Sequence, residues 1–109
     1  MPDHLSVLLG GYREAVVQIL GNRLSRMILY GSYARGDFKQ DSDMDIMILA
    51  DIRPEEISSY ADKVYDVTYD FEMQYGMEIN PSIQSIQTYE QWKDVYPFYM
   101  NIEKDGVAV

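Results

Sequence analysis

The sequence predicts one α+β domain, spanning residues 1–109, in which a small mixed β-sheet is backed by helices on one face. Three observations predict this fold. Apolar residues recur at helical spacing over residues 3–20 and 54–75. Two short segments have the length and the polar borders of buried strands: the apolar run 27–30, and residues 43–50, which are apolar after the aspartates at their start. The chain has 109 residues, of which 47% are hydrophobic, and this suits one domain with one core.

The predicted elements follow one another as helix, strand, strand, helix, strand, helix. The first helix, about residues 3–20, carries one apolar face and ends at Gly21. That face consists of Leu5, Leu8, Leu9, Tyr12, Val16, Ile19 and Leu20. The apolar run 27–30 then predicts a buried strand that stops at Gly31.

Residues 31–42 are polar and predict a loop with one helical turn. A loop of this length allows the strands on either side of it to pair antiparallel. The second strand is expected over residues 43–50. Pro54 suits the first turn of a long helix that ends near Tyr75.

The long helix returns the chain for a third strand, expected over residues 77–86 in a parallel or mixed arrangement. Pro81 predicts that this strand lies at an edge of the sheet or carries a bulge. Thr88 is expected to cap a short helix that runs through Lys93, and a last helix is expected over residues 97–106.

The charge balance restricts the partners of this chain. Nine Lys and Arg residues stand against eighteen Asp and Glu residues, a net charge of −9, and no basic block occurs. This argues against stable nucleic-acid binding by the chain alone. No apolar run approaches the ~20 residues that span a bilayer, so no membrane association is expected. The absence of cysteine and of a signal-peptide pattern at residues 1–4 predicts a cytoplasmic protein.

Asp43 and Asp45 stand two residues apart at the start of the second predicted strand. Strand side chains alternate, so both carboxylates point to one face, about 6–7 Å apart along the strand. Such a pair is able to share Mg²⁺ ions through hard oxygen ligands, with substrate phosphates completing the coordination. Ser42 is a candidate to orient Asp43 or the loop by a side-chain hydrogen bond. The alternative is a pair of solvated aspartates beside an ordinary turn serine.

The turn after the first strand has the composition of a phosphate-binding corner. Gly31 permits close backbone approach, and Ser32 offers a hydroxyl and an N–H at the start of a helical turn. Arg35 and Lys39 lie on the same loop, within reach of phosphate oxygens. The alternative is a turn chosen for shape, in which Ser32 is a helix cap and Gly36 ends the turn.

Taken together, residues 31–36 and 42–49 resemble the signature of the DNA polymerase β-type nucleotidyltransferase superfamily. The matching residues are Gly31-Ser32, Ala34-Arg35-Gly36 and Ser42-Asp43-x-Asp45, followed by Ile46-Met47-Ile48-Leu49. The small size is similar to the minimal nucleotidyltransferase branch, as are residues 75–85 and 97–107. The resemblance implies a polymerase β-like nucleotidyltransferase fold.

The resemblance also implies a chemistry. ATP would bind with Mg²⁺, usually two ions, with Gly31 and Ser32 on the terminal phosphates and Asp43 and Asp45 on the metals. A hydroxyl would attack the α-phosphorus, and pyrophosphate would leave. Arg35, Gly36 and Ser42 belong to the same nucleotide-binding segment.

The superfamily normally has a third carboxylate on a later strand, and Glu78 is the candidate for it here. Glu78 is expected on the third strand. An alignment on Tyr75, Pro81 and Ser85 instead puts the family's aspartate at Gly76, one strand repeat from Glu78 on the same face. The alternative is that Glu78 is an ordinary solvent-facing residue.

Minimal nucleotidyltransferases resemble the antitoxins of two-gene pairs whose toxin is a HEPN-domain ribonuclease. This implies transfer of AMP from ATP-Mg to a hydroxyl, a tyrosine, of the partner toxin; homo-oligomerisation stays open. Three alternatives remain: a non-catalytic module that masks its partner, a nucleotidyltransferase for aminoglycoside-like small molecules, and a nucleic-acid nucleotidyltransferase, which the charge of −9 disfavours.

Overall fold

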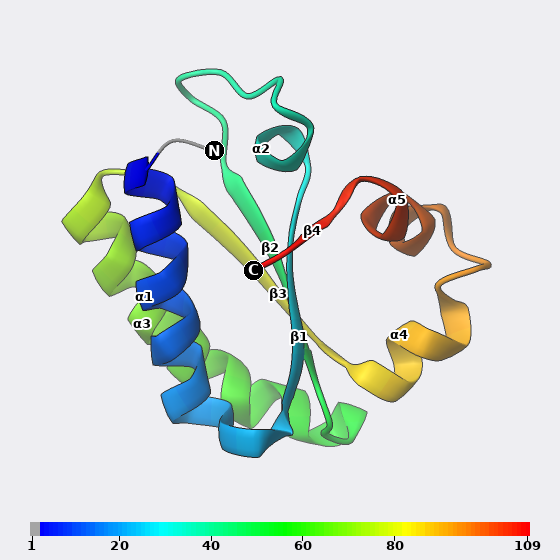
Figure 1. Cartoon of the computed structure of the whole chain (residues 1–109). Helices are drawn as coiled ribbons and strands as arrows, with labels where there is room; N and C mark the ends of the chain where they lie inside the picture. The colour runs from blue at the N-terminus through cyan, green and yellow to red at the C-terminus, as the bar shows by residue number, and fades with distance from the viewer. Residues whose placement is uncertain (1–2) are drawn as a thin grey trace.

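The computed structural model describes residues 3–109 and contains a four-stranded sheet between two layers of helices (Figure 1). The elements in chain order are α1 (Asp3–Leu20), η1 (Gly21–Arg23), β1 (Leu24–Tyr30), α2 (Ser32–Arg35), β2 (Met44–Ala50), η2 (Pro54–Glu56), α3 (Ile57–Tyr75), β3 (Ile79–Ser85), α4 (Ile86–Trp92), α5 (Pro97–Asp105) and β4 (Val107–Ala108). Within these described residues no helix has the length and apolar character needed to cross a membrane.

The sheet is mixed, with the strand order β3-β2-β1-β4. Strand β1 pairs antiparallel with β2 and with β4, whereas β2 pairs parallel with β3. The crossover between β2 and β3 runs through α3, as a parallel pair requires. The predicted α+β class, the antiparallel first pair and the edge position of the strand that carries Pro81 are therefore confirmed.

Helices α1 and α3 cover one face of the sheet and form the larger part of the core with it (Figure 1). Tyr12 of α1 is fully buried, and its ring meets Phe71 of α3 edge-on with 5.6 Å between the centroids. The Tyr12 hydroxyl donates to Thr68 Oγ1 at 2.6 Å, since Thr68 in turn donates to the Val64 carbonyl. This polar contact links the two helices inside the core.

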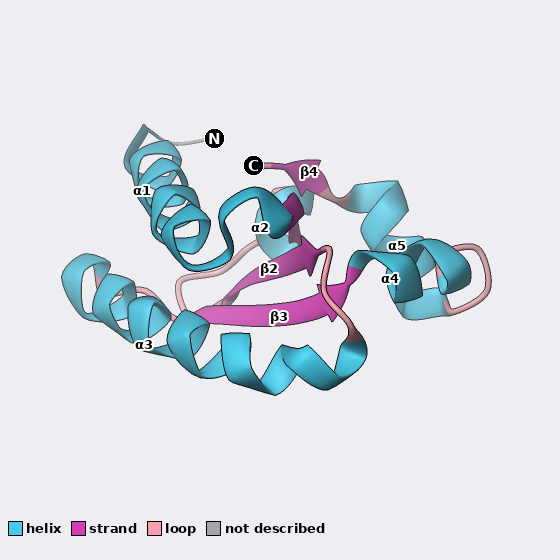
Figure 2. Ribbon diagram, turned by 90° about the horizontal axis from the view of Figure 1, so that it is seen from below, coloured by secondary structure: helices cyan, strands magenta, loops and turns pink. Residues whose placement is uncertain are grey.

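Helices α4 and α5 cover the opposite face, so the prediction that helices back only one face was wrong (Figure 2). A second core forms there from Ile28, Met47, Leu49, Tyr89 and Ile102. The physical reason is visible in β1 and β2, whose central residues are apolar in succession rather than alternately. Strands buried on both faces read as continuous hydrophobic runs.

Three strand boundaries differ from the prediction. Strand β1 begins at Leu24, three residues before the predicted run, and β2 begins at Met44, one residue later than predicted. Strand β3 begins at Ile79, so Glu78 lies directly before the strand rather than within it. The two-residue strand β4 was not predicted because so short a segment carries no periodicity.

The short helix α4 begins at Ile86, three residues earlier than a cap at Thr88 predicts, and its cap is not Thr88. Ser85 is the N-cap, and its hydroxyl accepts from the Thr88 N–H at 3.5 Å. A serine at the N-cap satisfies one of the free N–H groups of the first turn. The last helix, α5, begins at Pro97 and is followed by Gly106, as predicted.

Candidate active site

The candidate site lies at the end of the sheet where β1 ends and β2 begins. Tyr30 and Asp45 are direct partners in the antiparallel ladder, and Gly31 follows Tyr30 at once. Gly31 has φ +75° and ψ −154°, a backbone conformation that is open almost only to glycine. A Cβ built at this position would lie 2.5 Å from Asp45 Oδ2. The glycine therefore allows the turn to lie directly against the carboxylate.

Helix α2 is a single turn that starts immediately after Gly31. The Gly31 carbonyl accepts from the N–H groups of Ala34 and Arg35, both at 3.1 Å. The first N–H groups of a helix have no partner within it, so that end of α2 is suited to an anion. Gly36 ends the turn with φ +83° and donates its N–H to the Ser32 carbonyl. The structure thus places Gly36 as the residue that shapes the end of the turn.

Asp45 lies on the face of the sheet that α4 and α5 cover, and it is half-buried. Its Oδ1 accepts from Asn80 Nδ2 at 3.0 Å, while its Oδ2 faces Gly31. Asn80 is the residue beside Asp45 in the parallel ladder. The carboxylate is therefore held in place from both sides, by an amide on β3 and by the glycine turn on β1.

Asp43 and Glu78 are brought together beside the start of β2. The Met44 N–H donates to the Glu78 carbonyl at 2.9 Å, which aligns Glu78 with the residue before Met44. A hydrogen bond with Asp43 and the charge of Asp43 raise the pKa of Glu78, and Glu72 adds to this. Both Asp43 and Glu78 are exposed. Gly76, the other candidate position for the third carboxylate, is the left-handed residue that ends α3.

The donor set of these carboxylates fits Mg²⁺. Among the ion pairs of the described residues, none engages Asp43, Asp45 or Glu78. Asp43 and Glu78 are two carboxylates in contact, and their repulsion is relieved when a proton or a cation lies between them. No cluster of three or more His, Asp or Glu side chains able to hold a metal occurs in residues 3–109. Waters and substrate phosphates would therefore have to complete the coordination, which is how Mg²⁺ is usually bound.

A cavity of about 390 Å³ opens between α2, the start of β2 and α5. It is lined by Tyr30, Gly31, Ser32, Arg35, Asp45, Phe98, Asn101, Ile102 and Asp105. Its volume falls in the range of roughly 300–1,000 Å³ that small-molecule sites occupy. Four of the lining residues belong to α5, and none of them carried a motif that predicts a site residue. The family resemblance of residues 97–107 was the signal that pointed to this helix.

The remaining predicted site residues have different places. Arg35 lines the cavity, is half-exposed, and its Nε lies 3.3 Å from Asp37 Oδ2. The Ser42 hydroxyl accepts from the Lys39 N–H at 2.8 Å, so it fixes the shape of the loop before Asp43. Neither Ser42 nor Lys39 lines the cavity beside Asp45.

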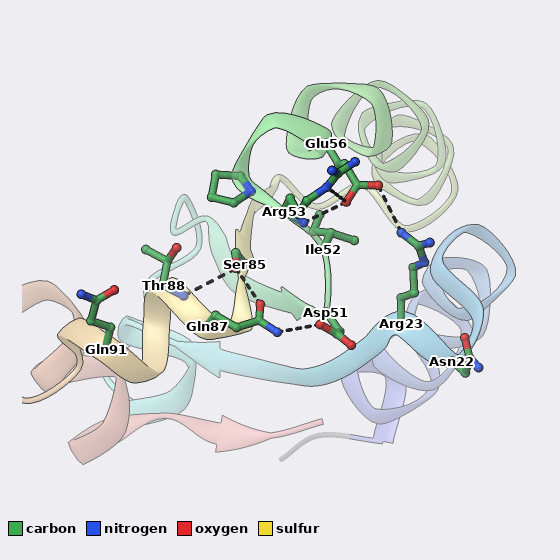
Figure 3. Close-up of a pocket in the computed structure, with 11 residues that line it drawn as sticks. Asn22, Arg23, Asp51, Ile52, Arg53, Glu56, Ser85, Gln87, Thr88 and Gln91 are labelled. Atoms are coloured by element: carbon green, nitrogen blue, oxygen red, sulfur yellow. Dashed lines mark hydrogen bonds and ion pairs between the residues drawn. The ribbon is translucent and has the colours of Figure 1, made fainter.

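A larger cavity, of about 600 Å³, lies at the opposite end of the sheet, where β2 and β3 end (Figure 3). Its charged groups bond to one another. Glu56 meets Arg23 at 3.2 Å and Arg53 at 3.3 Å. Gln87 donates to Asp51 at 2.6 Å. Because these groups are already paired, the cavity offers a ligand few unsatisfied charges. It also lies at the other end of β2 from Asp43 and Asp45.

Residues 9–103 match the family model described as "Nucleotidyltransferase domain". The chain is 33% identical over 84 residues to "Putative protein adenylyltransferase MJ0604" of Methanocaldococcus jannaschii, which covers 77% of this chain and 76% of that protein. It is 33% identical over 100 residues to "Putative protein adenylyltransferase MJ0141" of the same organism, covering 90% and 91%.

The fold is similar to one chain of a crystal structure described as "toxin-antitoxin with AMP-PNP". The TM-score is 0.56 at 14% sequence identity, and the match covers 90% of this chain and 69% of that chain. At this identity the likeness concerns the fold, and it agrees with the mixed sheet and helices described above.

Proposed function

This chain belongs to the nucleotidyltransferase domain family and is a nucleotidyltransferase; on that basis we propose that it transfers AMP from ATP to a tyrosine hydroxyl of a partner protein. In this proposal residues 1–109 work as one domain. The names of the two relatives support a protein acceptor, and the neighbour that contains an ATP analogue supports ATP as the donor.

One observation carries the proposal: the Gly31 turn lies directly on the Asp45 carboxylate, inside a cavity of nucleotide size. Ser32 and Arg35 line the same cavity and would take the terminal phosphates. The N–H groups at the start of α2 would add to their attraction for an anion. Gly36 and Ser42 would act indirectly, by fixing the shape of the loop on which these groups sit.

Helix α5 supplies the other wall of the cavity and would hold the nucleoside. Phe98 packs edge-on against Tyr30, with 5.8 Å between the ring centroids, so its ring is positioned at the cavity. The Asn101 amide has both a donor and an acceptor, and it would bond the base or the ribose.

Asp43 and Asp45 would hold Mg²⁺, and two ions suit the usual arrangement for this chemistry. When bound, the metal would neutralise phosphate charge and activate the attacking oxygen. Glu78 would stand at the outer side of this site, beside Asp43, where the third carboxylate of the superfamily serves the acceptor. Asn80 would keep Asp45 in the orientation that faces the phosphates.

The partner we propose is a HEPN-type ribonuclease toxin, with this chain as the antitoxin. The fold shared with a chain of a toxin–antitoxin structure supports this role. The net charge of −9 suits a basic partner surface, because complementary charge speeds association and suppresses wrong partners.

A second candidate function is a module that binds nucleotide and masks its partner without transfer. The observation that favours it is the donor set: in the described part of the chain no three acidic or histidine side chains form one metal cluster. Masking would keep the toxin neutralised when Asp43 is replaced by Asn.

The test is incubation of the purified protein with the product of the neighbouring gene, Mg²⁺ and ATP labelled at the α-phosphate. We expect label on the partner with the wild type and none with Asp43→Asn. Asp62→Asn, on the exposed side of α3, is the matched control and should label the partner normally. No label with the wild type, together with equal toxin neutralisation by Asp43→Asn, would refute the transferase and leave masking.

A further inference from the structure

The outer face of α3 exposes apolar and acidic side chains together, and we propose that it binds a basic amphipathic helix of a partner protein. Helix α3 runs along the margin of the molecule in Figure 2, with the sheet and α1 on its inner side. The inference rests on the proposed function only in expecting a protein partner. The binding itself takes place outside the cavity beside Asp45 and requires neither ATP nor Mg²⁺.

Tyr65, Tyr69 and Met73 form an apolar ridge on this face. They stand four residues apart, so their side chains are neighbours along the helix. Their exposed fractions are 53%, 61% and 67%, whereas the opposite side of α3 is buried in the core. Within residues 3–109 no aromatic ring contact involves Tyr65 or Tyr69. Tyrosine is enriched among the residues that dominate protein–protein binding, so this ridge is suited to a protein contact.

Two carboxylates flank the apolar ridge. Asp66 and Asp70 stand three residues before Tyr69 and Met73, a spacing at which helix side chains are adjacent. Both aspartates are exposed, and none of the ion pairs within the described residues includes either of them. Residues 64–75 contain no Lys, Arg or His. The ridge and these two aspartates, called the α3 surface below, therefore combine apolar area with uncompensated negative charge.

The charge of the α3 surface decides between possible partners. A second copy of this chain, related by a two-fold axis, would place the same aspartates face to face, and like charges across an interface repel. Nucleic acid and anionic lipid are disfavoured because their phosphates are also negative. A protein segment with Lys or Arg beside apolar side chains complements both features of the surface.

The shape of the α3 surface favours a helix as that segment. The ridge from Tyr65 to Met73 covers eight residue steps and is roughly 12 Å long, about two helical turns. Side chains four residues apart form a ridge that packs into the groove of another helix. The matching partner helix has apolar residues at three- and four-residue spacing, with basic residues beside them.

The α3 surface runs toward the candidate active site. It begins after Asp62 and Lys63, two adjacent residues of opposite charge. It ends at Met73, five residues before Glu78. Glu78 in turn hydrogen-bonds with Asp43 at the start of β2. A partner bound along α3 is therefore held at the end of the sheet that carries the candidate site.

The probe is a fluorescein-labelled peptide of about 20 residues, long enough to be helical in an alanine-rich background. Leucines three and four residues apart form one face, and arginines lie beside them. A second peptide has glutamates in place of the arginines. Binding of each peptide to the full-length protein is measured by fluorescence anisotropy without ATP or Mg²⁺, at low and high salt.

Two variants change the α3 surface, and each has a matched control. Tyr69→Ala shortens the ridge and keeps a good helix former, while Asp66→Lys reverses one charge. Val95→Ala and Asp94→Lys make the same kinds of change at exposed residues between α4 and α5. Circular dichroism checks that each variant is folded, and calorimetry gives its affinity for ATP.

We expect the wild type to bind the arginine peptide at least tenfold more tightly than the glutamate peptide, and less tightly at high salt. Tyr69→Ala and Asp66→Lys should each weaken binding of the arginine peptide by about five- to tenfold. Asp66→Lys should also bind the glutamate peptide more tightly than the wild type does. Both controls should bind as the wild type does, and ATP affinity should stay within about twofold in all four variants.

Equal binding of the two peptides by the wild type, or no binding of the arginine peptide, would overturn the inference. So would wild-type affinity for the arginine peptide in both Tyr69→Ala and Asp66→Lys. Self-association of the wild type in sedimentation equilibrium that Tyr69→Ala abolishes would assign the surface to a second copy instead. Failure to bind ATP would refute the proposed function and leave the peptide result standing, so the two failures are distinguishable.

Discussion

The Cα of Gly31 lies against the carboxylate of Asp45, and this contact joins the end of β1 to the start of β2 in the candidate active site. A methyl group on Gly31 would occupy the space of Asp45 Oδ2. The glycine also has a positive φ that other residues adopt only with strain. The contact therefore predicts that even the smallest substitution of Gly31, by alanine, disturbs the site.

Replacing Gly31 by Ala should abolish nucleotidyl transfer and lower the free energy of unfolding by roughly 1–3 kcal/mol, the strain of this backbone conformation. Urea denaturation and the labelling assay measure the two effects. Gly10→Ala is the matched control, because Gly10 is helical and its Cβ would meet open space. That change should leave transfer intact and stabilise the protein by about 0.5–1 kcal/mol. Normal transfer by Gly31→Ala would contradict the site.

Ser32→Ala should weaken ATP binding modestly and leave the fold intact. Ser32 lines the cavity beside Asp45, and in our proposal its hydroxyl donates to a charged phosphate oxygen. A hydrogen bond to a charged group contributes about 1.5–3 kcal/mol, or a loss of roughly 10- to 150-fold in affinity. Calorimetric titration with ATP and Mg²⁺ measures this. The same affinity in Ser32→Ala as in the wild type would remove the hydroxyl from the phosphate site.

Asp43→Asn should leave the metal-free protein as stable as the wild type or slightly more stable, because Asp43 and Glu78 are like charges in contact. The measurement is thermal unfolding in the presence of a chelator. A large fall in the melting temperature would show that Asp43 has a structural role instead.

The same contact predicts a pH dependence of stability. The pKa of Glu78 is raised in the folded state, so the folded protein holds that proton more tightly than the unfolded chain does. This contribution to stability is present below the ordinary glutamate value and is lost as the pH rises through the raised value. Urea unfolding of the metal-free protein from acid to neutral pH should show the loss, and Asp43→Asn should reduce it. An identical pH profile in both proteins would contradict the contact.

Tyr12→Phe should lower the free energy of unfolding by about 0.5–1.5 kcal/mol, because the buried hydroxyl loses its bond to Thr68. Burial raises the pKa of Tyr12 to about 12. The neutral phenol is thus favoured in the folded state, and stability is lost as the pH rises from the unfolded value near 10 through about 12. Alkaline unfolding followed by circular dichroism should show a shallower decline in Tyr12→Phe. An equally steep loss of stability in Tyr12→Phe and in the wild type would show that a group other than Tyr12 causes the alkaline unfolding.

Much of this arrangement could be predicted from the sequence where local signals decide it. The position of Asp45 beside the glycine turn follows from two short strands that the polar loop of residues 31–42 allows to pair antiparallel. The helical turn after Gly31 and the edge position of Pro81 follow from local backbone preferences.

The rest depends on how elements pack, which local signals do not encode. The contact between Asp43 and Glu78 requires the parallel register of β2 and β3, two strands that α3 separates in the sequence. Helices on both faces were missed because a continuous apolar strand does not say what covers each side. Phe98 and Asn101 reach the cavity only because α5 folds back onto the second core.

The position of α5 has a consequence during synthesis. Gly31, Asp43 and Asp45 leave the ribosome before residues 97–105, which form the remaining wall of the cavity beside Asp45. A nascent chain that ends before residue 97 has the carboxylates of Asp43 and Asp45 but lacks the wall of the cavity that α5 forms. If the proposed function holds, tight nucleotide binding begins only after α5 has been translated and has packed against the sheet.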